Sequence, residues 1–330
     1  MNIGLKIDVN TYRGTRRGVP ALVALLQKHR AGASFLFNLG PDRTGRAVGR
    51  LLRPGFLGKA WRTSALSHYG PITLLRGTLL PSVDIGRRCA GLMRSVRDAG
   101  FEVGIHTYDH LRWENRVAHA GAAWTRRELE RACQRFRDIF GTEPRVHGAA
   151  GWRMNRHAYR LTQALGFGYC SDTRGTQPFV PLCQAEVIAC PQLPTTLPTL
   201  DELIGTDGIT RDNVAEQILQ RTRDGLDTGH VYTAQAELEG MKLAPAFERL
   251  LQGWREMGCR VLSLGDYFDA LPDKNLPRHE VAIGTVPGRA EYVALQGEEF
   301  LAWPAPTTPL PEGGRLPSPP APLPQRGEGS

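Results

Sequence analysis

The chain has 330 residues, of which 41% are hydrophobic and 22% are charged, which is the composition of a globular protein with a core of normal size. No apolar run reaches the roughly 18–20 residues of a membrane-spanning helix, and the first ten residues lack the pattern of a secretory signal. The net charge of +8 indicates attraction to an anionic partner, such as a nucleic acid, a phospholipid surface or a phosphorylated substrate, without choosing among them. The six cysteines contain no C-x-x-C pair, so we expect reduced, mostly buried thiols in the cytoplasm.

Strand and helix patterns alternate along most of the chain. Alternating or apolar runs predict strands over residues 3–9, 33–40, 101–106, 145–150, 168–172, 230–235 and 259–264. Helical spacing predicts helices over 19–30, 86–100, 125–141, 155–167, 211–225 and 244–258. In the third of these helices, Thr125 and Glu128 have the spacing of a capping box, and Gly141 is placed to end the helix. Repeated units of this kind predict an α/β fold with a parallel sheet, either open or closed into a barrel.

Two segments fall outside this pattern. Residues 41–70 form an insertion that combines basic residues with apolar anchors. Its candidate residues for contact with a substrate or a membrane surface are Arg43, Arg46, Arg50, Arg53 and Trp61. Such a segment suits an anionic membrane surface, and it equally suits a solvated insertion whose apolar residues pack on the domain. Residues 271–302 follow the last predicted strand as a C-terminal extension, and the Pro- and Gly-rich residues 303–330 are expected to form a disordered tail.

Polar residues stand at the ends of three predicted strands. Asp8 and Asn10 follow the first strand, His106 and His110 follow the strand 101–106, and Gln235 ends the strand 230–235. Because parallel α/β folds place their sites at the carboxyl ends of the strands, we expect these side chains to converge. A histidine pair four residues apart is a weak signal by itself and is compatible with a structural role.

The stretch HTYDH, residues 106–110, resembles the second motif of the polysaccharide deacetylase (NodB-type) family. Further stretches follow the order found in one subgroup, the 4-deoxy-4-formamido-L-arabinose-phosphoundecaprenol deformylases: GLKIDVNTYRGTRRGVP, EVGIHTYDH, AAGWRMN, SDTRGTQPFVPL, LPTTLPTLDELIG and VYTAQAELEG. The resemblance covers most of residues 1–270 and implies a single domain folded as a distorted (β/α) barrel.

The resemblance also implies a role for each motif residue. Asp8 would be the catalytic base, His106 and His110 would bind a divalent metal ion, and Arg153 would hold the base carboxylate. Asp201 would orient the acid on the strand 230–235.

Two positions depart from the family pattern. Asn10 stands where the family has a ligating aspartate, and Gln235 stands where it has the histidine that acts as general acid. An asparagine can bind a metal ion through its oxygen but brings no charge, and a glutamine cannot titrate.

The function that the resemblance implies is metal-dependent removal of the formyl group from an amino-sugar linked to undecaprenyl phosphate. The enzyme would act at the cytoplasmic face of the inner membrane, in lipid A modification and resistance to polymyxin-like cationic peptides. Two alternatives stay open: a catalytically impaired relative that binds such a lipid without hydrolysing it, and a deacetylase of another amino-sugar. Nucleic-acid binding is not expected, since the Arg-rich insertion contains no nucleic-acid module.

Overall fold

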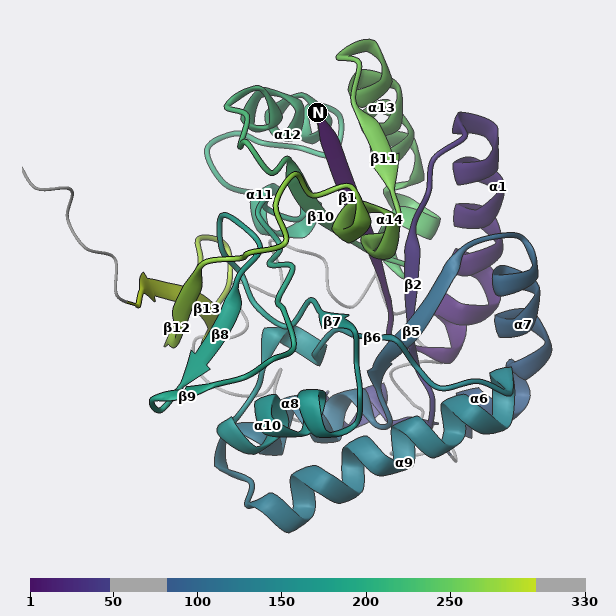
Figure 1. The fold of residues 1–330 in the computed structure, drawn as a ribbon. Coiled ribbons are helices and arrows are strands. Elements are labelled where there is room, and N and C mark those ends of the chain that lie inside the picture. The colour runs from purple at the N-terminus through teal and green to yellow at the C-terminus, as the bar shows by residue number, and fades with distance from the viewer. Residues whose placement is uncertain (48–81, 301–330) are drawn as a thin grey trace, which may run out of the picture. The chain divides into compact units, whose positions relative to one another are not determined.

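The computed structural model describes residues 1–47 and 82–300 (Figure 1). In these residues a parallel sheet has the strand order β10-β1-β2-β5-β6-β7, and β11 pairs with the beginning of β1. The strands are β1 Asn2–Val9, β2 Ser34–Asn38, β5 Glu102–Thr107, β6 Val146–His147, β7 Tyr169–Cys170, β10 His230–Gln235 and β11 Arg260–Leu262. The predicted α/β fold with a parallel sheet is therefore confirmed.

Helices connect the strands and cover the outer face of the sheet (Figure 1). They are α1 Val19–His29, α6 Ile85–Arg88, α7 Ala90–Asp98, α8 His110–Arg116, α9 Ala122–Phe140, α10 Arg156–Ala164, α11 Leu200–Leu203, α12 Val214–Arg223, α13 Ala244–Glu256 and α14 Leu264–Asp269.

The N-terminal boundary of α9 corrects one prediction. The helix begins at Ala122 with Gly121 as its N-cap, so Thr125 lies within the first turns and its hydroxyl donates to the Gly121 carbonyl. The capping-box assignment was wrong because the helix starts one turn earlier than the pattern indicated. Gly141 ends the helix as predicted, with a φ of 73°.

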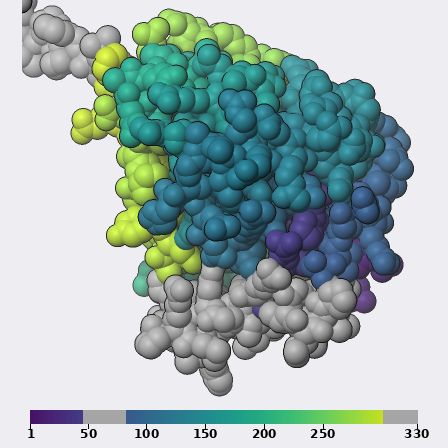
Figure 2. Space-filling model, turned by 90° about the horizontal axis from the view of Figure 1, so that it is seen from below, coloured from purple at the N-terminus to yellow at the C-terminus, as the bar shows by residue number. Residues whose placement is uncertain are grey.

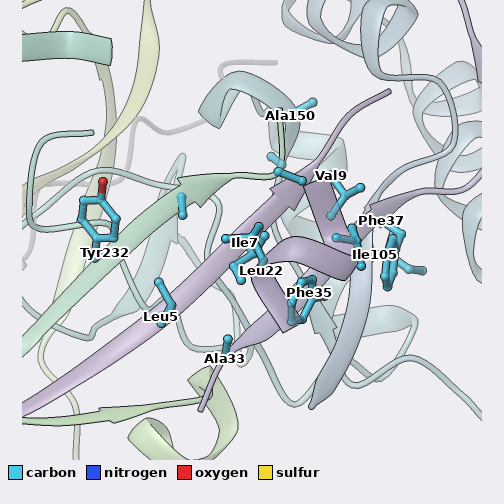
Figure 3. Packing of buried hydrophobic residues seen from close by; sticks show 14 of the residues in the cluster. Leu5, Ile7, Val9, Leu22, Ala33, Phe35, Phe37, Ile105, Ala150 and Tyr232 are labelled. Carbon is cyan, nitrogen blue, oxygen red and sulfur yellow. The ribbon is translucent and has the colours of Figure 1, made fainter. Parts of the chain in front are cut away.

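The alternation of β1 separates its apolar and polar residues. Ile3, Leu5, Ile7 and Val9 are fully buried, and Figure 3 shows Ile7 beside Leu22 of α1. Since successive side chains of a strand point to opposite faces, Lys6 and Asp8 turn toward the inner side of the sheet, and both are buried. The helix-facing side of β1 is therefore core, and its inner side is polar.

Two short π-helical segments hold the ends of β1 and β10 together. The first, Gly14–Gly18, follows β1, and the second, Leu238–Lys242, follows β10. A Cβ atom at Gly18 would lie 1.9 Å from the carbonyl oxygen of Ala236, and one at Gly240 would lie 2.5 Å from the Gly18 oxygen. Only glycine permits this approach of the two backbones, which fixes the strand ends that carry Asn10 and Gln235.

A second, smaller sheet was not predicted from the sequence. It has the order β13-β12-β8-β9, with β8 Val180–Cys183, β9 Glu186–Val187, β12 Arg278–Gly284 and β13 Val293–Glu299. A two-stranded pair, β3 Pro41–Asp42 and β4 Val83–Asp84, lies apart from it in the sheet topology. Residues Met1–Phe300 form one compact unit, so the hairpin β12–β13 of the predicted extension packs as part of the domain.

Several sequence predictions concern residues that the structure does not describe. Most of the insertion 41–70 and the tail 303–330 lie outside the described residues. Within the described residues, none of the helices has the length and apolarity to cross a membrane.

The glycine contact between the two strand ends gives a stability prediction. We expect Gly18→Ala to lower the free energy of unfolding by about 1–3 kcal/mol, because the new methyl group meets a backbone oxygen that cannot move alone. Gly91→Ala is the matched helical control, since a Cβ there meets no atom within 4 Å, and this variant should be neutral or slightly stabilising. Urea unfolding measures both, and equal stabilities would show that the close approach is unimportant.

Candidate active site

The ends of β1, β5 and β10 bring the predicted polar residues to one edge of the sheet. In the parallel register, Asp8 of β1 lies opposite Gln235 of β10. His106 is the second-last residue of β5. Figure 2 views the molecule from this end, where the blue to teal segments around residues 100–170 spread across the face and the yellow-green hairpin lies along one side.

His106 and His110 lie side by side with one free ring nitrogen each. Their rings stack at a centroid distance of 5.8 Å, and the Nδ1 atoms of both rings are buried without a hydrogen-bond partner. The other side of each ring is held, since His110 Nε2 lies 3.2 Å from Glu114 Oε1 and His106 hydrogen-bonds to the backbone of Gly148. This is how proteins orient histidines that bind metal ions.

The pKa values of the two histidines shift in opposite directions because their charged neighbours differ. Burial lowers the pKa of His106 well below its ordinary value, with the neighbouring His110 as the next cause. Burial would also lower the pKa of His110, but the carboxylates of Glu114, Glu237 and Asp109 outweigh it and raise that pKa. His106 is thus kept neutral, the state in which imidazole binds a cation.

Asp8 is a buried carboxylate with a lysine as its nearest cation. Lys6 Nζ lies 3.9 Å from Asp8 Oδ1 and donates to the Ser171 carbonyl, while His106 Nδ1 lies 3.5 Å from the same Asp8 oxygen. Burial raises the pKa of Asp8, an effect that Lys6 opposes.

Arg153 does not occupy the place that the resemblance implied. Its Nη1 donates to the carbonyl of Glu114 at 2.6 Å, and the cation that the structure puts beside Asp8 is Lys6. Sequence reasoning missed Lys6, although its offset of two residues from Asp8 on a strand places both side chains on one face.

Gln235 and Asp201 are brought together across 34 residues of sequence. Gln235 Nε2 donates to Asp201 Oδ1 at 3.3 Å, and the Thr199 hydroxyl donates to the same oxygen at 2.7 Å. The Gln235 backbone is fixed by Glu239, whose Oε2 accepts from its N–H at 2.8 Å. The amide of Gln235 therefore points toward Asp201.

Glu237 is a buried residue that sequence reasoning missed. Its Oε1 accepts from the N–H groups of Asn10 and Thr11 and from the Thr11 hydroxyl, at 2.8–3.0 Å. Its Oε2 is buried and has no hydrogen-bond partner, and burial raises the pKa of its carboxyl group. Its position between two strand ends becomes visible only once β1 and β10 are paired.

Five of the buried atoms near these strand ends that lack hydrogen-bond partners are potential metal ligands. They are Asp8 Oδ1, Asn10 Oδ1, His106 Nδ1, His110 Nδ1 and Glu237 Oε2. Buried polar atoms almost always have a hydrogen-bond partner. Carboxylate and amide oxygens and imidazole nitrogens can bind divalent cations through their lone pairs. The residues present therefore fit a divalent cation.

Comparisons with known proteins identify the family of this chain. The family model described as polysaccharide deacetylase matches residues 5–170. The chain is 38% identical to a Shewanella sediminis protein named "Probable 4-deoxy-4-formamido-L-arabinose-phosphoundecaprenol deformylase ArnD" over 89% of this chain and 94% of that protein. The chain belongs to the polysaccharide deacetylase family. A protein of the same name from Wigglesworthia glossinidia brevipalpis is 31% identical over 86% of this chain and 98% of its own length.

The fold of this polysaccharide deacetylase also has solved counterparts. The crystal structure of a candidate polysaccharide deacetylase from Mycobacterium smegmatis superposes with a TM-score of 0.59 at 16% identity, covering 86% of this chain and 94% of that one. The predicted fold class, a distorted barrel of the deacetylase type, is confirmed in the form of a parallel half-barrel sheet.

A cluster of cations surrounds Trp152 on the inner side of this deacetylase sheet. Lys6 Nζ and the guanidinium groups of Arg174 and Arg289 lie 5.0, 5.0 and 4.4 Å from the centroid of its ring. Both arginines also bond the buried Glu202 Oε1 at 2.7 Å. Arg289 comes from the loop of the β12–β13 hairpin, so the C-terminal extension contributes a side chain to this region.

Hydrogen bonds hold most atoms of a second group of possible metal ligands, although His147 Nε2 is buried without a partner. Among the described residues, His147, Cys170 and Asp172 alone place three such ligand atoms within 4.8 Å of one another, so the donor atoms around His106 are spaced more widely. Asp172 Oδ1 bonds His147 Nδ1 and the Ala149 N–H, and Oδ2 accepts from Gln192. Burial raises the pKa of Cys170 well above its ordinary value, so its sulfur stays a thiol. These contacts indicate a structural role for the three residues.

The predicted surface residues are described only in part. Arg43 Nη1 lies 2.8 Å from Asp109 Oδ2, and Asp109 also caps α8, which begins at His110. Arg43 therefore braces the loop that carries a candidate ligand. The side chain of Arg46 and the residues Arg50, Arg53 and Trp61 lie outside the described part of the chain.

Glu239 gives a pH-dependent prediction. Burial raises its pKa from 4.5 to about 8, so the folded state keeps a proton that the unfolded state releases between these values. The stability of the wild-type chain should therefore fall relative to Glu239→Gln as the pH rises from about 4.5 to about 8, and the gap should then stay constant. Urea unfolding of the metal-free proteins between pH 5 and 9 measures the difference. Parallel stability curves would contradict the assignment.

Proposed function

We propose that this chain hydrolyses the formamide of 4-deoxy-4-formamido-L-arabinose linked to undecaprenyl phosphate, releasing formate and the amino-sugar lipid. The observation that carries the proposal is the set of unpaired buried acceptors beside Asp8, in a chain that matches deformylase relatives over nearly their whole length. A hydrolysis of this kind needs a polarised amide, an activated water and a base.

The chain's own residues provide the base and the ligands. Asn10, His106 and His110 would hold a divalent cation, which when bound polarises the amide carbonyl and acidifies water. Asp8 would take the proton from the attacking water, and Lys6 at 3.9 Å favours the ionised carboxylate that this step requires.

Gln235 changes the second half of the reaction. It cannot give a proton to the leaving amine, but its amide can donate a hydrogen bond, as it does to Asp201. The proton must then reach the amine from Asp8 or from solvent, so we expect slower turnover than with a histidine at this position.

The cations around Trp152 suit an anionic substrate. Glu202 bonds both arginines through one oxygen and neutralises the charge of at most one of them. Arg289 is the partly accessible member, with 18% of its side chain exposed, and only its Nε is used by Glu202. Its terminal nitrogens can therefore bind the phosphodiester of a lipid-linked sugar.

Binding at the cytoplasmic face of the inner membrane follows from such a substrate. The net charge of +8 favours an anionic lipid surface, and the basic insertion 41–70 contributes to that charge. A deacetylase of another amino-sugar would use the same base and ligands but would have no need for a phosphate contact at Arg289.

A binding protein without catalysis is the second candidate function. The observations that favour it are Asn10 and Gln235, which remove a charged ligand and a titratable acid together. Such a protein would hold the sugar lipid through the Trp152 cations and release no formate.

Formate release distinguishes the two candidates. We expect the purified chain to release formate from the formamido-arabinose lipid only with a divalent cation, and Asp8→Asn to reduce the rate by at least 100-fold because the base is lost. Asn10→Asp combined with Gln235→His should raise kcat, since these changes restore a charged ligand and an acid.

One outcome of the same assay would contradict the proposed hydrolysis. A wild-type rate equal to that of Asp8→Asn, with activity only in the doubly substituted chain, would support the binding protein and end the enzymatic proposal.

Arg289 provides a test of the anionic substrate. We expect Arg289→Gln to raise KM about tenfold with a smaller change in kcat, because a charge-assisted contact to phosphate is lost. Arg278→Gln, at an exposed position of the same hairpin, is the matched control and should leave KM unchanged. A KM equal to wild type in Arg289→Gln would place the phosphate elsewhere.

A further inference from the structure

The cation site has a shortage of negative charge if only the motif residues are counted. Asp8 is its one motif carboxylate, because position 10 is an asparagine and the two histidines bind a cation as neutral rings. Divalent cations in oxygen and nitrogen sites are held more weakly as ligand charge falls. A second buried carboxylate near these residues would remove the shortage.

Glu237 is placed to supply that charge. Its carboxylate is 3% exposed and reaches from the end of β10 to the turn after β1, where Oε1 bonds the backbone N–H of Asn10 itself. The same side chain therefore lies beside a candidate ligand of the cation.

The two oxygens of Glu237 have different surroundings. Oε1 accepts three hydrogen bonds, which accounts for a structural role in holding the turn. Oε2 is equally buried and accepts none, although burying half of a carboxylate without a partner is costly. A role in holding the turn alone therefore leaves Oε2 unexplained.

We infer that Glu237 supplies the negative charge of the cation site that an aspartate at position 10 would otherwise supply. Asp8 and Glu237 then provide two negative charges, the number that aspartates at positions 8 and 10 would provide. The inference rests on the proposed function, because it concerns the same divalent cation. Glu237 acts here through its charge as a positioning residue.

Metal affinity, measured without substrate, tests this inference. Co²⁺ is titrated into the metal-free full-length chain and followed by calorimetry and by its visible absorption. Glu237→Gln keeps an oxygen that can accept from Asn10 and Thr11 and removes only the charge, so we expect it to bind Co²⁺ at least about tenfold more weakly than wild type. Asn10→Asp should bind more tightly, and Asn10→Asp with Glu237→Gln should return to about the wild-type affinity.

Glu239→Gln is the matched control for this experiment. Glu239 is a buried acid two residues away that keeps its proton at neutral pH, and both of its oxygens have partners, at Tyr232 and at the Gln235 N–H. Its loss should leave the Co²⁺ affinity unchanged. Should Glu237→Gln not fold, Glu237→Asp and Glu237→Asn have equal lengths and differ in charge, and the Asp variant should bind about tenfold more tightly.

Two results would overturn the inference, and they can be told apart. If wild type binds Co²⁺ and Glu237→Gln binds it equally well with only a lower melting temperature, Glu237 is a clamp and the proposed function stands. If neither wild type nor Asn10→Asp binds Co²⁺, the metal-dependent function itself fails, and the role of Glu237 fails with it.

Discussion

The Glu237 carboxylate fastens the end of β10 to the turn after β1, and the geometry of the whole candidate site depends on that contact. The bond from the Asn10 N–H spans 227 residues of sequence, so no local interaction could replace it. Three hydrogen bonds to one oxygen offset the cost of burying a charge, and the approach of Gly18 to Gly240 holds the same two segments sterically. The paired residues of β1 and β10 end with Asp8 opposite Gln235, directly before these contacts.

The inner face of the sheet is polar because β1 alternates, and its polarity is incompletely neutralised within the protein. Lys6 partly compensates Asp8, and Glu114 fixes His110, yet acceptor atoms on Asp8, Asn10, His106, His110 and Glu237 stay unpaired. We propose that a divalent cation binds three of them, the Asn10 oxygen and the two histidine nitrogens. In the proposed function the two departures from the family pattern would act on different steps, since Asn10 would weaken cation binding and Gln235 would remove a proton donor from the reaction.

Sequence alone predicted the parts of the molecule that rest on local pattern. The strands and most helices followed from apolar periodicity, and the strand-end rule gathered Asp8, His106 and Gln235 at one edge. Thr125 was misassigned because a capping pattern also occurs inside a helix, while the capping box of the structure is formed by Thr199 and Glu202. Glu237 and Arg289 could not be found from sequence, because their roles exist only after distant strands pair and the C-terminal hairpin packs onto the domain.

The central claim is that a divalent cation binds between the ends of β1 and β5. Anomalous diffraction from crystals grown with Co²⁺, recorded on both sides of the cobalt absorption edge, locates such an ion directly. We expect one peak bounded by Asn10 Oδ1 and by the Nδ1 atoms of His106 and His110. A peak within the cluster of His147, Cys170 and Asp172 instead, or no peak beside His106 at saturating Co²⁺, would contradict the account.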